Sequence, residues 1–116
     1  MAIVVSKTSA TRTERSWQPF DEVNGASNKG VRLAVDLANE NATFLFVDID
    51  PQGSIAMHSQ PERAVCFIVE GDGWIIVEGQ SDVAYAKGDM IMFDPDVLHG
   101  WRGNDAPTRI LVGVLP

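Results

Sequence analysis

The chain has 116 residues, 45% of them hydrophobic and 22% charged, and a formal net charge of -7. That length and composition suit one globular domain with an ordinary apolar core. The acidic balance excludes the basic footprint that nucleic-acid binding requires, and it disfavours anionic membrane surfaces. A small anionic ligand is still compatible, because a pocket can be locally basic inside an acidic protein.

No targeting segment or disulfide is expected. The apolar run at 3–5 is too short for the core of a signal peptide. No stretch of about 18 apolar residues occurs, so no membrane-spanning helix is expected, and the cytoplasm is the expected compartment. The single cysteine, Cys66, cannot form an internal disulfide, and its apolar surroundings predict a small buried side chain.

Short apolar runs separated by turn residues predict strands along the chain, and helical periodicity is nearly absent. The N-terminal segment 1–25 is expected to contribute a strand at 2–5 and an extended stretch at 16–20, with a loop following at 24–30. Further strands are expected at 31–37, 42–49, 54–58, 64–70, 74–79, 83–86, 90–93, 97–102 and 108–114.

Turn residues predict how these strands connect. "ANEN" at 38–41 predicts a hairpin, "PQG" at 51–53 a break in the chain, and "GDG" at 71–73 a tight hairpin between its two flanking strands. Short strands spaced about 8–12 residues apart are typical of a sandwich, jelly roll or barrel. The sequence therefore predicts one all-β domain.

The chain has two histidines, and each follows a turn. His58 ends a short strand after a glycine, and His99 lies shortly after the "DPD" turn at 94–96. They are far apart in sequence, but an antiparallel barrel could bring their segments together. We therefore expect both histidines to belong to one site.

Two stretches resemble the sequence motifs of the cupins. "GSIAMHSQPERAVCFIVEGDG" at 53–73 is similar to the first motif, which runs glycine, a short strand, His-x-His, Glu and Gly. "KGDMIMFDPDVLHGWRGN" at 87–104 is similar to the second, which runs Gly-Asp, an apolar strand, a turn and His. The resemblance implies the double-stranded β-helix of a cupin jelly-roll barrel, as a single domain over 1–116 with the barrel at about 31–114.

The resemblance assigns ligand positions one by one. His58 and His99 match motif histidines, Gln60 stands where a further histidine would be, and Ala64 stands where the glutamate would be. Asp96 replaces the usual turn glycine. Alternate residues of a strand share a face, so Gln60 can point where His58 points.

Two kinds of site follow, and His58 and His99 are the candidate catalytic residues in both. A divalent metal ion (Fe, Mn, Ni or Zn) would be held by the two histidines with Gln60 or Glu62 as the third ligand. A metal-free site would use the histidines as general acid and base, because an unperturbed imidazole titrates near pH 6.5.

The resemblance implies a barrel interior that binds or transforms a small polar metabolite. Dioxygenase-like chemistry with a metal and isomerase- or epimerase-like chemistry are the enzymatic classes that it implies. The alternative is a metal-free, non-catalytic module that binds or senses a ligand, and the weakened positions Gln60 and Ala64 favour it.

Trp101 and Arg63 are the candidate ligand contacts. Trp101 shares a strand face with His99 and could wall a pocket, although packing in the core is the commoner role for tryptophan. Arg63 could bind a carboxylate or phosphate with two hydrogen bonds, although a solvated pair with Glu62 is the commoner arrangement.

Five other side chains have simpler expected roles. Phe44, Phe46 and Phe67 are expected in the core, because large aromatic side chains are usually buried. Tyr85 is expected on the surface of a hairpin. Asp48 alternates with apolar neighbours, which predicts that it lies on a solvated sheet face.

The expected partners are a small molecule and a second copy of the chain. The apolar segment 2–5 would leave a strand edge open, and such edges tend to pair with other chains. Cupins often cover this edge by pairing strands between two protomers, so the resemblance implies a homodimer. Nucleic acid and membranes are not expected as partners.

Overall fold

The structure is a computed structural model that describes residues 2–3, 12–13 and 15–116. These residues form strands and connecting turns, and they contain no helix that is long and apolar enough to cross a membrane. The strands are β1 Ala2–Ile3, β2 Arg12–Thr13, β3 Gln18–Pro19, β4 Glu22–Val23, β5 Ala26–Ser27, β6 Lys29–Ala38, β7 Thr43–His58, β8 Arg63–Glu70, β9 Asp72–Val77, β10 Val83–Ala86, β11 Met90–Phe93, β12 His99–Gly103 and β13 Thr108–Leu115.

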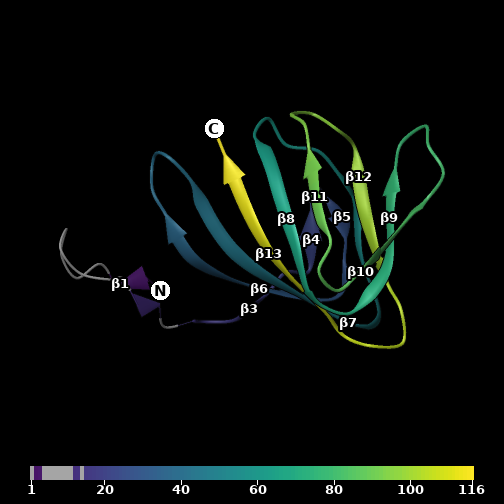
Figure 1. Ribbon diagram of the computed structural model, residues 1–116, viewed down its shortest axis with the longest axis horizontal. Coiled ribbons are helices and arrows are strands. Elements are labelled where there is room, and N and C mark those ends of the chain that lie inside the picture. The colour runs from purple at the N-terminus through teal and green to yellow at the C-terminus, as the bar shows by residue number, and fades with distance from the viewer. Residues whose placement is uncertain (1, 4–11, 14) are drawn as a thin grey trace.

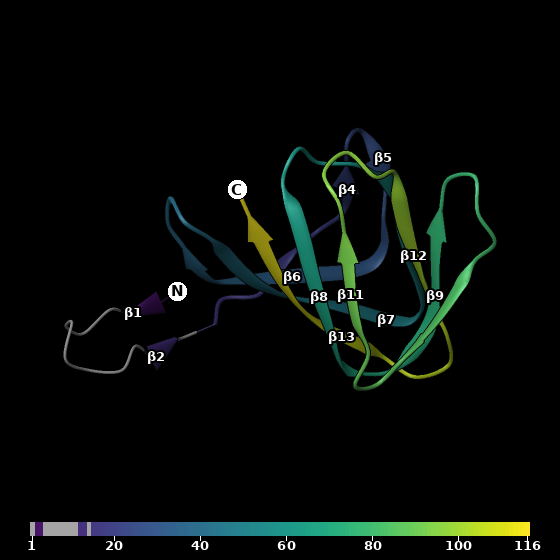
Figure 2. The ribbon, with the colours of Figure 1, turned by 45° about the horizontal axis from the view of Figure 1, so that its top comes forward.

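One antiparallel nine-stranded sheet curls into the barrel (Figures 1 and 2). Its order is β10-β9-β12-β7-β13-β8-β11, with β6 beside β7 and β3 beside β6. The long strand β7 belongs to both halves, because its first part pairs with β6 and β13 and its end pairs with β12. This arrangement confirms the predicted all-β jelly-roll barrel.

Most of the expected barrel strands are confirmed. The ranges 83–86 and 90–93 match β10 and β11 at both ends, and β6 and β7 form the expected hairpin. These segments are apolar runs between strong turn formers, which leaves little choice of boundary. The extended stretch at 16–20 is also confirmed, since it contains β3.

The predicted break at 51–53 is wrong, because β7 runs through it. Gln52 has a φ of 60° and donates its backbone N–H to the Asn104 carbonyl at 2.9 Å, so the strand bends and keeps its pairing. A Cβ on Gly53 would lie 2.7 Å from the Lys29 carbonyl oxygen, so glycine is needed where β6 crosses. The turn residues here mark a bend within one strand.

The predicted hairpin at 71–73 is also wrong. Strand β8 pairs with β13 and β11, whereas β9 pairs with β10 and β12. Gly71 has a φ of 91°, and a Cβ there would lie 2.5 Å from the Pro107 carbonyl oxygen. Glycine therefore makes a crowded corner, through which the chain passes from one half of the barrel to the other.

The expected loop at 24–30 instead contains β5 and the start of β6. Strands β4 and β5 form a hairpin whose turn residues, Asn24 and Gly25, both have positive φ, at 49° and 80°. Two positive φ values define the tight hairpin turn that Asn-Gly favours. At the N-terminus, Ala2–Ile3 pairs with Arg12–Thr13 of the same chain, and the rest of the expected strand, 4–5, lies outside the described residues.

The core fills the barrel between the two halves of the sheet. Its largest fully buried side chains are Ile49, Ile68, Ile75, Ile110 and Thr108. Tyr85 is also buried, which corrects the expectation that it lies on the surface. Its hydroxyl shares a 2.8 Å hydrogen bond with the Thr108 hydroxyl, so its polar atom is satisfied inside.

Asp48 is buried too, contrary to the expected solvated position. Arg109 donates two hydrogen bonds to its carboxylate, at 2.8 and 2.9 Å, and Arg32 approaches to 3.4 Å. A buried carboxylate needs such partners, because burial without them is costly. The partners come from neighbouring strands that sequence alternation alone does not reveal.

Candidate functional site

The structure brings the two histidines side by side. His58 at the end of β7 is the register partner of His99 at the start of β12. Their ring centroids lie 4.4 Å apart with the planes tilted by 52°. The two histidines pair because β7 ends, and the antiparallel strand β12 begins, at the same rim of the barrel.

Each imidazole is fixed by its own strand. His58 Nδ1 lies 2.8 Å from the Ala56 carbonyl oxygen, and His99 Nδ1 lies 2.9 Å from the Val97 carbonyl oxygen. A carbonyl can only accept a hydrogen bond, so Nδ1 is the protonated nitrogen in both rings. In the neutral rings Nε2 therefore carries the lone pair, which can accept a proton or a ligand's hydrogen bond.

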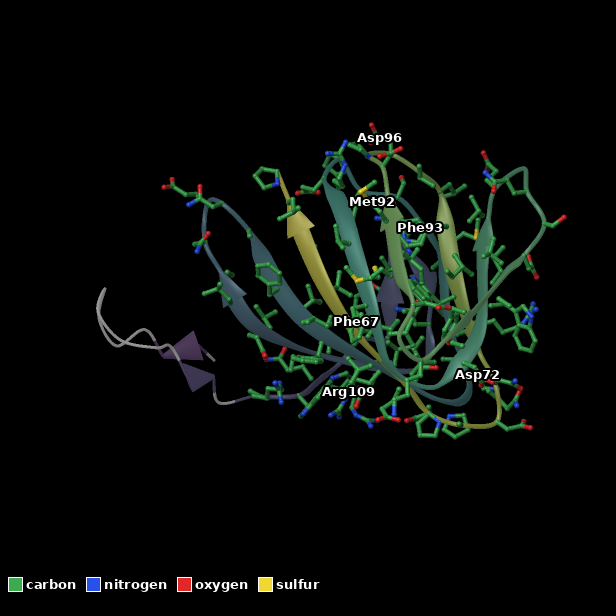
Figure 3. All side chains as sticks on the ribbon, viewed as in Figure 1. Phe67, Asp72, Met92, Phe93, Asp96 and Arg109 are labelled. Atoms are coloured by element: carbon green, nitrogen blue, oxygen red, sulfur yellow. The ribbon has the colours of Figure 1, made fainter. Side chains whose placement is uncertain are left out.

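Aromatic side chains support His99 from behind. The Phe93 ring stacks on it with centroids 3.7 Å apart and planes 11° from parallel. Trp101 meets Phe93 edge-on at 5.9 Å and Tyr85 at 5.4 Å. Figure 3 labels Phe93 near the rim of the barrel. This packing holds the His99 ring in one orientation.

A cavity of about 140 Å³ opens beside the histidine pair. Its polar side chains are His58, Gln60 and His99, and all of its other lining residues are apolar. The apolar lining is Phe20, Val23, Leu33, Leu45, Val47, Ile55, Ala64, Cys66, Trp101, Ile110, Val112 and Val114. The site is therefore an apolar pocket with one polar end.

Two expected residues lie in the cavity wall and two do not. Gln60 and Trp101 line it together with the histidines. Glu62 and Arg63 are not among the lining residues, and the Arg63 guanidinium lies 3.6 Å from the Asp94 carboxylate on the exposed side. The placement of Arg63 therefore gives it no contact with a ligand in this cavity.

The β4–β5 hairpin covers the cavity, and the sequence analysis missed it. It brings Val23 into the lining, next to Phe20. Asn24 Oδ1 accepts a hydrogen bond from the Ser59 N–H at 3.1 Å, and Asn28 Oδ1 accepts one from the Ala56 N–H at 2.9 Å. The Asn-Gly dipeptide at 24–25 was the available signal for this hairpin.

The thiol of Cys66 in the cavity wall is a poor nucleophile. Burial raises the pKa of Cys66 to about 12. The thiol, rather than the thiolate, is then present at neutral pH, and only the thiolate is a strong nucleophile. Cys66 therefore acts as one of the small apolar side chains of the wall, and the sequence prediction that it is buried is confirmed.

A resident metal ion fits this donor set poorly. The described residues contain no group of three His, Cys, Asp or Glu side chains that could hold a metal, so Glu62 does not join the histidines. The candidate ligands are then two imidazole nitrogens and the neutral Gln60 amide, with Ala64 where a carboxylate would stand. Catalytic metal sites commonly use about three strong protein ligands. Among the residues that the structure describes, none of the carboxylates lines the cavity to offset a divalent charge.

The pKa of His99 lies below its usual value. Burial is the main cause, and the neighbouring His58 lowers it further, while the hydrogen bond to the Val97 carbonyl partly opposes the shift. The imidazole is therefore held neutral to a lower pH than a solvated one. A neutral ring with a free Nε2 is the form that acts as a base.

Stability should consequently depend on pH through His99. Because the unfolded state binds this proton more readily, the free energy of unfolding should be highest above the unfolded pKa of about 6.5 and fall as pH decreases below it. We expect His99→Asn to flatten this decline below the unfolded pKa of about 6.5. Urea unfolding at several pH values measures it. An equally steep decline in the variant would assign it to other groups.

The fold and the cavity together define a jelly-roll barrel of the kind that binds small molecules. The cupin domain model matches residues 45–114, and the chain belongs to the cupin domain family. No curated protein matches the sequence.

Solved structures agree with this assignment. A cupin 2 conserved barrel domain protein from Rhodopseudomonas palustris has a TM-score of 0.75 at 20% identity, covering 87% of this chain and 71% of that one. An RmlC-like cupin from Shewanella frigidimarina has a TM-score of 0.70 at 20% identity, covering 90% and 85%. The polyketide cyclase RemF from Streptomyces resistomycificus has a TM-score of 0.74 at 16% identity, covering 99% and 80%. At these identities the likeness shows the fold.

Proposed function

We propose that this cupin binds a small molecule with an apolar body and one polar group, and that the histidine pair transfers a proton on it. The observation that carries the proposal is the pair of imidazoles at the polar end of an apolar cavity. Both rings have Nδ1 tied to a carbonyl, which leaves Nε2 of each for the ligand. The activity would be isomerase-like and would need no resident metal.

The size of the cavity limits the ligand. An engineered apolar cavity of about 150 Å³ binds benzene, so about 140 Å³ suits a molecule near the size of one ring. The lining favours a ligand with a carbon-rich body. The polar metabolite that the sequence predicts is therefore replaced in this proposal by a molecule with one polar group. A polyketide cyclase among the structural neighbours supports a carbon-rich substrate in such a barrel.

The proposed step uses one imidazole as a base. Nε2 of neutral His99 accepts a proton from a carbon beside the polar group of the ligand, and the electron pair of the broken C–H bond passes to that group. The imidazolium then returns the proton to a neighbouring atom, which completes an isomerisation. The Gln60 amide would donate a hydrogen bond to the polar group, and Nε2 of neutral His58 would accept one from a donor on the ligand. A positioned base of this kind commonly contributes about 10²–10⁴ in rate.

Proton exchange tests this proposal with a simple probe. We expect cyclohexanone, a ring-sized ketone, to shift the NMR signals of the cavity residues. It should also exchange its α-protons with D₂O faster than in an equal concentration of free imidazole. His99→Asn should remove the acceleration, typically by at least about 10²-fold, in a variant that circular dichroism shows to be folded.

The outcomes separate the two functions. Binding without exchange would identify a non-catalytic ligand-binding module, which is the reading that Ala64 favours. An absence of both binding and exchange would contradict the proposal, because the cavity would then hold no ring-sized ketone. Exchange that persists in His99→Asn and is lost in His58→Asn would assign the base to the other histidine.

A further inference from the structure

The wall of the cavity is made of two kinds of segment. Most of its lining residues lie on β6, β7, β8, β12 and β13, which are joined by the backbone hydrogen bonds of one sheet. Phe20 and Val23 lie instead on the segment that covers the cavity, just before β4 and within it. A strand of the sheet cannot leave the wall without breaking its ladder, so the covering segment is where the wall can open most readily.

Residues 21–28 form a small unit of their own, which we call the covering hairpin. Strands β4 and β5 pair with each other in a separate two-stranded sheet, and the Asn28 N–H closes its base by donating to the Asp21 carbonyl at 2.8 Å. Within the part of the chain that the structure describes, no backbone hydrogen bond joins this hairpin to the barrel strands. Side chains therefore make its attachment.

The covering hairpin has an apolar face and a polar face. Val23 and its register partner Ala26 are half-buried, and Val23 lines the cavity. Glu22 and its partner Ser27 are exposed. Figure 2 shows β4 and β5 at the upper end of the barrel, where β12 begins. The hairpin thus lies over the cavity with its apolar side inward.

Two asparagines of the covering hairpin hold the backbone on either side of His58. Asn28 Oδ1 accepts a hydrogen bond from the Ala56 N–H at 2.9 Å, and Asn24 Oδ1 accepts one from the Ser59 N–H at 3.1 Å. The carbonyl oxygen of the same Ala56 lies 2.8 Å from His58 Nδ1 and orients the ring. The position of the hairpin is therefore linked to the position of one of the two imidazoles.

Asn28 stands where the backbone pairing of β7 changes. Strand β6 begins at Lys29, which pairs with Ser54, so Ala56 lies beyond the reach of β6. The Asn28 side chain supplies the acceptor that β6 does not, and its Nδ2 donates to the Phe20 carbonyl at 3.0 Å. Because an amide is both donor and acceptor, this one side chain ties both ends of the covering hairpin to β7.

Glycine provides a hinge where the covering hairpin joins β6. The register between β6 and β7 shifts between Lys29 and Val31, so Gly30 lies in an irregular step of the strand. Its φ of 64° is in the left-handed region, which glycine adopts readily. Hinges are commonly a few residues at the ends of elements, where they absorb the backbone changes of a moving segment.

We propose that the covering hairpin is a lid, and that Asn24 and Asn28 are positioning residues that hold His58 in place while the lid is closed. Opening breaks the hydrogen bonds to Ala56 and Ser59 and takes Val23 out of the wall, which admits a ligand. Closing restores the bonds and fixes the direction of His58 Nε2. The entry role rests on the proposed function, because it presupposes a ligand in the cavity, whereas the hold on His58 does not.

Hydrogen exchange on the ligand-free chain tests the lid. We expect the amides of Ala56 and Ser59 to exchange at least about 100-fold faster than that of Val112, which lies in β13 between β7 and β8, because opening a lid needs less than unfolding the sheet. Asn28→Ala should accelerate exchange at Ala56 by at least about 5-fold, as expected for the loss of one hydrogen bond.

Nitrogen NMR of the imidazoles tests the positioning role. The neutral wild-type rings should both carry the proton on Nδ1. In Asn28→Ala the two nitrogen shifts of His58 should move toward each other as both tautomers become populated, while those of His99 stay unchanged. Asn28→Asp keeps an acceptor for the Ala56 N–H and should restore the wild-type pattern. Asn24→Gly is a milder variant, because Asn24 has a φ of 49° and glycine fits its turn.

A second asparagine outside the hairpin provides the matched control. Asn39 Oδ1 accepts hydrogen bonds from the Asn41 and Ala42 N–H groups in the turn between β6 and β7, outside the cavity lining. Asn39→Ala therefore also removes side-chain bonds to the backbone, but it should leave exchange at Ala56 and the His58 shifts unchanged.

Binding of cyclohexanone tests the entry role. A lid that opens more often admits a ligand faster, so Asn28→Ala should raise the association rate by at least about 5-fold. An association rate equal to that of the wild type would overturn the entry role. Exchange at Ala56 and Ser59 as slow as at Val112 would make the hairpin a fixed wall.

The hold on His58 can be overturned separately. Wild-type His58 shifts in Asn28→Ala and Asn24→Gly, with circular dichroism showing both variants folded, would mean that the asparagines do not position the ring. If the lid and the shifts behave as expected but cyclohexanone does not bind, the proposed function alone is contradicted.

Discussion

Purified chain loaded with Fe²⁺, Mn²⁺, Ni²⁺ or Zn²⁺ is expected to retain far less than one equivalent of metal after desalting, whereas Gln60→His/Ala64→Glu is expected to retain one. The wild type offers two imidazoles and a neutral amide, and the double variant adds an imidazole and a carboxylate from the cavity wall. Changes outside the ligand set alone alter metal affinity about 10–100-fold. Two added ligands should therefore tighten Zn²⁺ binding at least about 100-fold, as measured by competition with a chelating dye.

Two controls make this comparison specific. Gln80→His adds a histidine on the exposed surface, outside the cavity lining, and should leave the metal content unchanged. Because Ala64 is buried, its replacement could disturb folding, so Gln60→His alone provides a milder variant with three imidazoles. If the wild type retained one equivalent of metal and His58→Ala/His99→Ala lost it, the proposal of a metal-free site would be refuted. Gln60 would then be the third metal ligand, as the sequence predicted.

The sequence predicted the histidine pair because motif spacing and strand direction act together. His58 and His99 each lie at a strand end near a turn, and antiparallel pairing of those strands leaves one register for both. It is harder to predict whether a residue that follows His58 in the sequence points into the cavity or away from it. Gln60 lines the cavity and Glu62 does not, since the chain leaves β7 after His58 and strand alternation no longer applies.

The turn residues predicted the connections between strands less well than the apolar runs predicted the strands themselves. A Gly-Asp-Gly segment supplies the backbone freedom for a hairpin and equally for the corner that the structure contains at 71–73, so sequence alone could not choose between them. Aromatic residues posed a similar ambiguity. Phe44 and Phe67 are apolar enough for a core, but strand parity places them opposite the interior side chains. That parity accounts for their exposure, so the expectation that they belong to the core is wrong.

Arg109→Met is expected to lower the free energy of unfolding by about 2 kcal/mol, measured by urea denaturation. The substitution removes both hydrogen bonds, 2.8 and 2.9 Å long, from the buried Asp48 carboxylate. Losing one partner of a buried pair typically costs about 3–5 kcal/mol, because the other charge is left desolvated. Here the loss should be smaller, since the Arg109 side chain is 40% exposed and Arg32 remains 3.4 Å from the carboxylate.

Removing both partners separates the cost of an unpaired charge from the value of the pair. Asp48→Leu/Arg109→Met should recover stability to within about 1 kcal/mol of the wild type, because no charge is then left buried. Arg102→Met is the matched control: Arg102 pairs with Asp82 at 3.2 Å, both are well exposed, and the cost should stay below about 1 kcal/mol. An equal loss in Arg109→Met and Arg102→Met would show that burial of Asp48 adds nothing.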